Sequence, residues 1–507
     1  MASKSKTLIK IIGGVAVLNL LSRLAGFVRD MIISYQFGTK TLADAIFAAY
    51  SLPYFLYVVL GGSLTTAFIS IYNKIEQPTI KASFRQQIVI GTGLLMVVLS
   101  LMFAFASTVI TRLFFYGMSE QTTIIIAHFL KVMAPSAFFM VMSMLISGIL
   151  NVQGYFRLTA LSTLVMNLLL IVIGIGGIKV WGATAHSLAV VIGSFAMLMM
   201  VGFQLKKQGL ISFKIGVKTS PYFKKFFKVF VPILLGGATL QFYTLLQRMF
   251  ASSLTEGAIS SLNYAMKLVT LPQGVVMGAV TTVIFPKLVE VVARSDGRQI
   301  KNYYAKGLRW LVLSIVPLSL FVLFFSEDVI RLIFEHGSFT STSTKVTSKI
   351  LGIIALSMLF NAANVYVTRF YYAYEKSVTP VVFNILSIFG INVIVTLATL
   401  NSLGVYGIAL GTMVSTVVNA LLLIWRLSPL LQVRVRDIVQ LRDGLFLVSF
   451  ALLLLIYRLF FPFEAAAMLN IVLEGLYFIV IGFLLAVVLK LPEVKKLYQH
   501  YLKKGDG

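Results

Sequence analysis

The sequence predicts an all-α polytopic membrane protein, and three observations carry that prediction. Hydrophobic residues make up 59% of the 507 residues and charged residues only 12%, whereas soluble domains contain about 45–50% apolar and about 25% charged residues. Apolar segments recur along the whole chain, each near the roughly 20 residues that a membrane-spanning helix needs. The Lys and Arg residues gather in alternate loops between these segments, as expected when cytoplasmic loops hold the positive charge.

Fourteen segments are long and apolar enough to be interpreted as transmembrane helices. The predicted ranges are 9–36, 42–72, 86–111, 123–150, 157–178, 182–205, 226–251, 258–286, 308–333, 346–374, 378–400, 404–425, 441–461 and 469–489. An even number of spans places both termini on one side of the membrane. With both termini in the cytoplasm, most Lys and Arg residues fall inside, and the minority outside are Lys40, Arg112, Lys179, Arg331, Lys345, Lys349 and Arg458.

This distribution explains most of the formal net charge of +26. In a soluble protein such a charge would suggest nucleic acid, but here it largely orients helices in a bilayer, so no nucleic-acid partner is expected. The N-terminus resembles a secretory signal, yet Ser22-Arg23 interrupts its apolar stretch and no cleavage site follows. We therefore expect a retained first span. With 0 Cys, the chain has no disulfide, thiolate metal site or Cys nucleophile.

A weak internal repeat joins the two halves of the chain. Arg112-Leu113-Phe114-Phe115 recurs as Arg331-Leu332-Ile333-Phe334, and Ser51-Leu52-Pro53 recurs at the same offset as Thr270-Leu271-Pro272. Each half contains six predicted spans and therefore enters the membrane from the same side. Such halves are related by a pseudo-two-fold axis along the membrane normal. This arrangement is typical of a transporter that works by alternating access, with a cavity between two bundles.

The repeat predicts four segments in the chain. They are an N-terminal six-helix lobe at 1–205, a basic cytoplasmic linker at 206–225, a C-terminal six-helix lobe at 226–426, and spans thirteen and fourteen with a cytoplasmic tail at 427–507.

Charged residues inside the predicted spans indicate a binding site, because each costs ~2.5–3.5 kcal/mol on insertion scales. Arg23 lies near the middle of the first span, and Asp30 lies ~10 Å further along the helix, so a direct ion pair between them is not expected. Arg29 lies nearer the outer end, where it contacts a ligand or snorkels to the interface. Lys267 and Lys131 lie deep in the eighth and fourth spans. This surplus of positive charge favours an anion such as a pyrophosphate headgroup.

Motifs of enzymes are scarce. The sequence contains no HExxH, Walker A or nucleophile-elbow motif, and we expect neither catalytic residues, a resident metal nor a cofactor. The acid pair Glu327-Asp328 lies at an outer loop edge and is interpreted as a solvated helix cap. Arg248, near the outer end of the seventh span, is interpreted as a membrane-interface anchor.

Several segments together carry a resemblance to a known family. They are Ser22-Arg23 with Gly26-Phe27 and Arg29-Asp30, Asp44-Ala45-Ile46-Phe47 with Leu52-Pro53, Gly148-Ile149-Leu150-Asn151, Leu262-Asn263-Tyr264-Ala265 with Leu271-Pro272, and Ile330-Arg331-Leu332-Ile333-Phe334-Glu335-His336-Gly337. These segments resemble the MurJ (MviN) lipid II flippases of the MOP exporter superfamily. The resemblance runs essentially from end to end. It implies export of undecaprenyl-pyrophosphate-linked muropeptide (lipid II) across the bacterial cytoplasmic membrane for peptidoglycan synthesis.

The resemblance also assigns site residues by position. Arg23 and Arg29 match the family's first-helix arginines, and Asp30 matches the acid beside them. Asp44 matches an acid at the start of the second helix, and Lys267 stands where familiar members have Arg. Ser22 and Lys131 complete the set of candidate substrate-binding residues.

The chain departs from familiar members at several positions. Tyr57-Val58 and Gly62 replace an Arg pair and a Glu, Thr270 replaces an acid, and Gln247 stands where some members carry an Asp. Coupling to an ion or to the membrane potential stays open at this point. The resemblance further implies a hydrophobic groove for the lipid tail at the last two spans, and we expect the protein to work as a monomer among membrane lipids.

Several alternatives to lipid II export stay open from sequence, among them a non-transporting scaffold of the wall-synthesis machinery. The chain could move another undecaprenyl-linked glycan, or act as a cation-coupled drug exporter of the same superfamily, although a cation exporter needs acids in its cavity. A polyprenyl-phosphate glycosyltransferase is another possibility, but such enzymes need paired acids to hold Mg²⁺.

Overall fold

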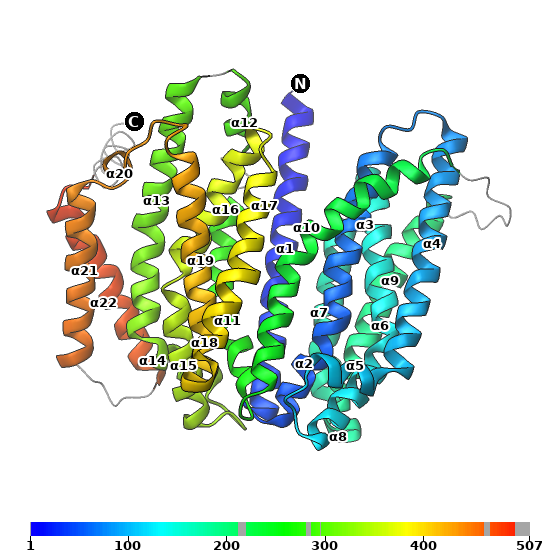
Figure 1. Cartoon of the computed structure of the whole chain (residues 1–507), viewed down its shortest axis with the longest axis horizontal. Helices are drawn as coiled ribbons and strands as arrows, with labels where there is room; N and C mark the ends of the chain where they lie inside the picture. Colours follow the sequence, from blue (N-terminus) through cyan, green and yellow to red (C-terminus); the bar gives the residue numbers. More distant parts are fainter. Residues whose placement is uncertain (1, 211–219, 280–284, 295, 461–466, 492–507) are drawn as a thin grey trace. The chain divides into compact units, whose positions relative to one another are not determined.

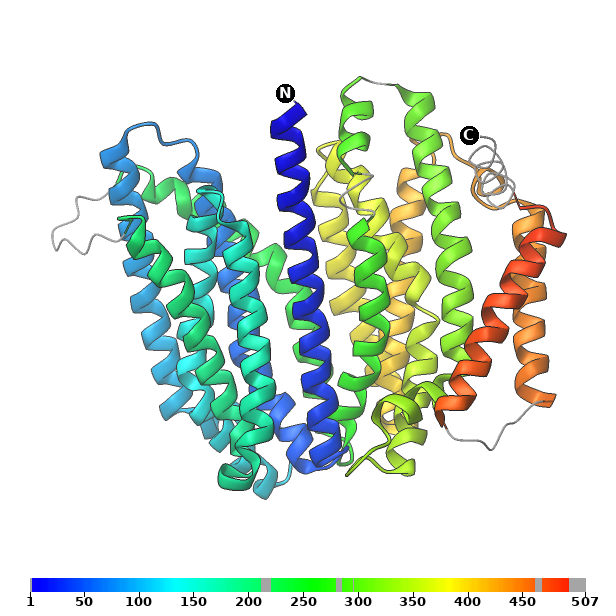
Figure 2. The same ribbon diagram turned by 180° about the vertical axis from the view of Figure 1, so that it is seen from behind.

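The computed structural model describes residues 2–210, 220–279, 285–294, 296–460 and 467–491. Its secondary structure is helical throughout these residues, without a strand, which confirms the all-α prediction. Parts of the predicted linker, eighth span and C-terminal tail (residues 211–219, 280–284 and 492–507) lie outside the described residues. The chain divides into two compact units, Met1–Ser260 and Ser261–Gly507, which are drawn from opposite sides in Figure 1 and Figure 2.

The helices of unit 1 cover the first seven predicted spans. They are α1 (Ala2–Phe37), α2 (Thr41–Leu56), the π-helical turn η1 (Tyr57–Gly61), α3 (Gly62–Tyr72), α4 (Pro78–Phe105), α5 (Ser107–Phe114), α6 (Glu120–Val152), α7 (Phe156–Gly176), α8 (Ile178–Trp181), α9 (Thr184–Lys207) and α10 (Phe223–Ser252), followed by the first turn of α11 (Ala258–Ala279).

The helices of unit 2 cover the remaining predicted spans. After α11 they are α12 (Phe285–Ala293), α13 (Gly297–Phe324), α14 (Ser326–Phe334), α15 (Ser341–Ala355), α16 (Met358–Ala373), α17 (Val378–Ile385), the π-helical turn η3 (Leu386–Asn392), α18 (Val393–Leu403), α19 (Val405–Leu427), α20 (Val435–Ile438), α21 (Leu441–Phe460) and α22 (Ala467–Val488).

Among the described residues, 11 helices are long and apolar enough to cross a membrane, or 12 if the bent pair α15 and α16 forms one span. The two predicted spans outside this set are α1, which carries Arg23, Arg29 and Asp30, and α11, which carries Lys267. The chain is therefore a multi-pass membrane protein, while the number of fourteen spans and the pseudo-two-fold symmetry stay predictions.

Helix α6 forms the centre of unit 1, where it packs against α2, α4 and α9. Small residues permit this close packing. A Cβ atom built at Gly148 of α6 would lie 2.4 Å from the Thr65 methyl group of α3, so only glycine fits there. The Thr65 hydroxyl also donates a hydrogen bond of 3.1 Å to the Met144 carbonyl of α6.

Helix α10 packs along α2, η1 and α3 (Figure 1). The Phe242 ring meets the Phe55 ring edge-on with centroids 6.2 Å apart, and Gly237 approaches the Ser63 hydroxyl. The division of the chain by contacts thus falls at Ser260, later than the predicted lobe boundaries at 205 and 226, and those boundaries stay a prediction from the repeat.

In unit 2, the last two long helices pack onto α13 and α14. The cluster of buried residues there contains Phe325, Phe450, Leu454 and Tyr457. Two ion pairs reinforce it. Arg309 of α13 binds both carboxylate oxygens of Asp443 at the start of α21, at 2.8 and 2.9 Å. The second pair joins Arg458 to Asp328.

That second pair corrects an interpretation from sequence. Asp328 is not a solvated cap, because its side chain is only 4% exposed and it accepts a 2.7 Å hydrogen bond from Arg458 of α21. Arg458 also approaches Glu474 of α22 at 3.9 Å. These charges therefore join α14 to the last two long helices.

Candidate functional site

One face of the second half of α1 is buried and carries most of the candidate polar residues of this helix. Ser22, Ala25, Arg29 and Ile33 are all buried, at the three- and four-residue spacing of a single helix face. This face packs mainly against α7. Arg23 is one residue removed from the buried stripe and is exposed.

Arg29 and Asp30 form a buried ion pair inside unit 1. The Nε and Nη2 atoms of Arg29 donate to Asp30 Oδ1 at 2.9 and 2.6 Å, and the two side chains are only 11% and 0% exposed. The Arg29 guanidinium also lies 5.1 Å from the centre of the Tyr50 ring, a distance typical of a cation–π contact. Arg29 is thus held inside the protein and does not reach out to an interface.

A second guanidinium shares this environment. Arg248 of α10 is half-buried and interacts electrostatically with Asp30, Tyr50 and Tyr54 of the same unit. Two guanidiniums around one carboxylate leave one positive charge in excess. A net positive charge in this partly buried cluster attracts an anion more strongly than it would in bulk water. Arg248 is therefore part of the site and more than the interface anchor inferred from sequence.

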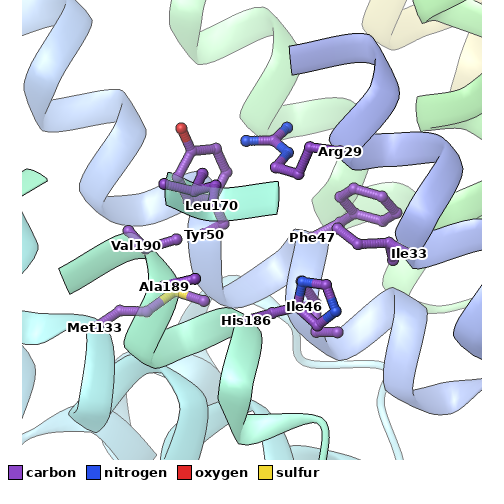
Figure 3. A pocket seen from close by; sticks show the side chains of 10 residues that line it. All are labelled: Arg29, Ile33, Ile46, Phe47, Tyr50, Met133, Leu170, His186, Ala189 and Val190. Carbon is purple, nitrogen blue, oxygen red and sulfur yellow. The ribbon is translucent and has the colours of Figure 1, made fainter. Parts of the chain in front are cut away.

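A small cavity adjoins the pair (Figure 3). Its volume of about 10 Å³ has room for about one water molecule. The Arg29 guanidinium points toward the Tyr50 ring on one side, and the His186 ring of α9 lies on the other. His186 Nε2 lies 2.6 Å from Gln36 Oε1 of α1, so this hydrogen bond joins α9 to α1 beside the ion pair.

Asp44 has a different position from the other candidates. It is buried, and its two carboxylate oxygens accept hydrogen bonds of 2.8 Å from the backbone N–H groups of Gly257 and Ser260. These N–H groups belong to the turn and first residues of α11, where a helix lacks internal acceptors. Asp44 therefore acts as a helix cap supplied from α2, a positioning role.

The neighbouring turn is also fixed by α2. Gly257 adopts φ +89°, and a Cβ atom there would lie 2.4 Å from the Thr39 carbonyl oxygen, so only glycine fits. The backbone N–H and the hydroxyl of Thr41 both donate to Glu256 Oε1. These hydrogen bonds hold the pKa of Glu256 below its ordinary value of 4.5.

A polar pocket of about 280 Å³ is lined on α1 by Val15 and Asn19, which precede Ser22 in the sequence. The Ser22 hydroxyl accepts a 2.9 Å hydrogen bond from Asn167 Nδ2 of α7, which joins α1 to α7. The pocket begins further along the same helices, and hydroxyls and amides dominate its polar lining. Its polar residues are Asn19, Tyr57, Thr65, Ser143, Ser147, Asn151, Thr159 and Thr163.

The structure does not gather all the predicted site residues into one cluster. Arg29 and Asp30 lie together, Ser22 and Asp44 lie elsewhere in unit 1, and Lys131 is exposed on α6. Lys267 belongs to unit 2, where it is half-buried on α11. Within the described residues, no group of three or more His, Asp or Glu side chains could hold a metal ion.

Sequence reasoning missed Tyr50, Tyr54 and His186. The two tyrosines stand four residues apart on α2 with ring centroids 5.5 Å apart, which is a pattern that the sequence does contain. No local signal could have found the contact of His186 with Gln36, because these residues lie 150 positions apart.

Comparison with known proteins agrees with this fold. The family model of the lipid II flippase MurJ matches residues 33–478. The probable lipid II flippase MurJ of Thermotoga maritima is 28% identical over 440 residues, which cover 85% of this chain and 86% of that protein. The lipid II flippase MurJ of Thermosipho africanus is 27% identical over 422 residues, covering 81% and 84%.

Solved structures give the same result. A lipid II flippase MurJ in an inward closed conformation superposes with a TM-score of 0.81 at 25% identity, covering 96% of this chain and 99% of that one. An inward-facing MATE family multidrug transporter of the MOP superfamily has a TM-score of 0.67 at 14% identity, covering 81% and 95%, and so shares the fold. The family is one of transporters rather than enzymes. The chain belongs to the lipid II flippase MurJ family.

Proposed function

We propose that this protein moves lipid II from the inner to the outer leaflet of the bacterial cytoplasmic membrane by alternating access. The observation that carries the proposal is the cluster of Arg29, Asp30 and Arg248, in which the Asp30 carboxylate pairs with Arg29 and also interacts electrostatically with Arg248. Membership of the MurJ family and the likeness to relatives named as lipid II flippases support it.

Asp30 serves in this proposal as an exchangeable counter-ion. In the substrate-free protein it stabilises the buried charge of Arg29. A pyrophosphate that enters brings several oxygens, each able to accept charge-assisted hydrogen bonds from a guanidinium. Release then restores the Arg29–Asp30 pair, so neither step leaves a buried arginine without a partner. An exchange between two anionic partners keeps substrate binding strong enough for entry and weak enough for release.

The polar pocket offers a place for the uncharged part of the headgroup. Its lining of hydroxyls and amides matches the hydrogen-bonding groups of a disaccharide, and no cation is among its lining residues. Tyr57, one of the departures from familiar family members, lines this pocket. We propose that neutral hydrogen bonds here replace headgroup contacts that other members make with arginines.

The remaining candidates take supporting roles in the proposal. Arg23 and Lys267 contact the pyrophosphate at other stages of the transport cycle. Lys131, which lies on α6, also contacts the anionic substrate. Asp44 positions the first turn of α11, and Ser22 holds α1 on α7.

Binding of undecaprenyl pyrophosphate to the purified protein tests the site. We expect Arg29→Ala to weaken binding at least about tenfold, since a hydrogen bond to a charged group contributes ~1.5–3 kcal/mol. Arg112→Ala is the matched control, because it also removes an arginine from an ion pair, but the Arg112 side chain is 61% exposed on the surface. Undecaprenol, which lacks phosphate, should bind both variants equally. Equal affinity of wild type and Arg29→Ala for undecaprenyl pyrophosphate would refute the assignment of the site.

Competition among lipid-linked glycans tests the substrate. We expect lipid II to displace undecaprenyl pyrophosphate more effectively than an undecaprenyl-pyrophosphate glycan that lacks the pentapeptide. The reverse order would favour the alternative of another undecaprenyl-linked glycan.

We further propose that both termini are cytoplasmic and that the monomer is the working unit. Since the chain has 0 Cys, single cysteines can report the topology directly. Lys74→Cys should stay protected from an impermeant thiol reagent in intact spheroplasts, whereas Tyr116→Cys, which replaces a residue 61% exposed, should react. The opposite labelling pattern would invert the orientation. Measurement of the mass of the purified protein in nanodiscs large enough for two copies tests whether it is a monomer.

A further inference from the structure

Unit 1 carries a large apolar groove on the side of α4, α6 and α9. Its volume is about 610 Å³, and almost all of its lining is apolar. Leu94, Val97 and Met199 on its walls are 65%, 44% and 48% exposed. None of the residues that line it belongs to the cationic cluster, so the groove is separate from the candidate site. The lining residues used below are Arg85, Gly93, Leu94, Val97, Met199 and Gly202.

Two glycines give the groove its depth. Gly93 of α4 and Gly202 of α9 both line it. A Cβ atom at Gly202 would meet no atom within 4 Å, and one at Gly93 would meet only the Met142 methyl group at 4.0 Å. Close helix packing therefore does not require glycine at either position. The effect of both glycines is to leave a hollow open toward the apolar surroundings.

One end of the groove is basic. Arg85 lines it and donates a 3.1 Å hydrogen bond to the Tyr72 hydroxyl, while Lys81 lies 4.7 Å from the centre of the same ring. Tyr72 is buried and so fixes both cations. Within the part of the chain that the structure describes, neither cation forms an ion pair. A guanidinium has five N–H donors, so Arg85 keeps donors for a phosphate.

The dimensions match one leaflet of a membrane. Along α4 the lining runs from Ala82 to Val97, which is ~22 Å at 1.5 Å per residue. Half of a hydrocarbon core is ~15 Å thick. The groove therefore extends from the depth of the headgroups to about the bilayer midplane, as an acyl chain does.

We propose that this groove is a binding site for an anionic diacyl phospholipid, with an acyl chain in the groove and the phosphate on Arg85 and Lys81. The basic end lies in the segment predicted to be cytoplasmic, so the lipid belongs to the inner leaflet. A bound lipid fills the hollow between α4 and α9 and supplies the counter-charge that these two cations lack.

Native mass spectrometry of the full-length protein, with phosphatidylglycerol or phosphatidylcholine added, tests the proposal. Gly202→Leu places a side chain in the groove, and its Cβ atom meets no atom within 4 Å. Gly91→Leu is the matched control, because Gly91 lies on α4 with open space around its Cβ position but does not line the groove. Arg85→Gln removes the charge at the end. Far-ultraviolet circular dichroism confirms that each variant is folded.

We expect wild type and Gly91→Leu to retain one phosphatidylglycerol at about tenfold higher affinity than phosphatidylcholine. Gly202→Leu should lose this retained lipid, and Arg85→Gln, which keeps Lys81, should show a smaller preference for phosphatidylglycerol than wild type. Unchanged retention of phosphatidylglycerol in Gly202→Leu overturns the proposal. So does equal retention of the two lipids by wild type, or displacement of phosphatidylglycerol by undecaprenyl pyrophosphate, which would assign the groove to the transported lipid.

Discussion

Replacement of Asp44 by Asn measures how much the cap of α11 contributes. The carboxylate accepts two backbone hydrogen bonds at 2.8 Å, from Gly257 and Ser260, in a buried environment. Asparagine keeps the shape of the side chain and one acceptor oxygen. Its amide group, however, brings N–H donors toward the second backbone N–H and leaves that donor unsatisfied.

The expected cost follows from these contacts. A hydrogen bond to a charged group contributes ~1.5–3 kcal/mol, and a buried unsatisfied donor costs ~1–3 kcal/mol. We therefore expect Asp44→Asn to lower the free energy of unfolding by about 2–4 kcal/mol. For a unit of this size that is a fall in Tm of roughly 5–15 °C.

Thermal unfolding of the detergent-purified protein is the assay, with Asp296→Asn as the control. Asp296 also accepts a backbone N–H at the start of a helix, from Gln299 at 2.9 Å, but this hydrogen bond is exposed and Asp296 is only partly buried. Because Asn caps an exposed helix about as well as Asp, the control should leave Tm nearly unchanged. If both variants shift Tm equally, the reasoning from burial and charge is wrong.

Three further outcomes follow from the described contacts. Glu256→Gln should lower Tm at neutral pH but not in acid. The folded-state pKa of Glu256 is depressed, so the stability that its carboxylate contributes is lost as pH falls below about 4.5. A difference in Tm between variant and wild type that stays constant across pH would contradict this. Gly307→Ala should lower Tm by several degrees, because its Cβ atom would lie 1.9 Å from the Tyr366 hydroxyl oxygen. In the control Gly390→Ala the added Cβ meets no atom within 4 Å, so Tm should stay unchanged or rise slightly. Equal shifts of Tm in the two variants would refute the explanation from packing. Asp328→Ala should destabilise the protein by ~1–3 kcal/mol, because it removes the 2.7 Å partner of the partly exposed Arg458. The double variant with Arg458→Met should recover stability, and failure to recover would contradict the pairing.

The helices were predictable because their signal is local. Apolar segments of roughly 20 residues appear in the sequence whatever they pack against, and described helices overlap every predicted range. The bend of 42° between α15 and α16 was not predictable, since neither Pro nor Gly, the usual causes of a kink, stands at Leu356-Ser357. The sequence pattern therefore suggested one continuous span there.

The candidate site was predictable only in part. Buried charge drew attention to Arg29 and Asp30, but neighbours on a helix do not normally face each other, so their pairing was not expected. The sequence indicates a surface cap at Asp328, because its partner Arg458 follows 130 residues later and is not visible in the local pattern. The place of Arg248 in the cluster depends on the packing of α10 against α2, which the sequence does not reveal. A sequence indicates the type of a residue and its depth in the membrane, whereas the partner of a buried charge depends on how the helices pack.

The central claim is that the excess charge of Arg29, Asp30 and Arg248 carries the lipid headgroup across the membrane. Its most direct test is the exposure of labelled lipid II on the outer face of cells whose only flippase is a variant of this protein. The account predicts that Arg29→Ala at normal protein level leaves lipid II on the cytoplasmic face, while the control Arg112→Ala exports it normally. Normal export by Arg29→Ala would contradict the account.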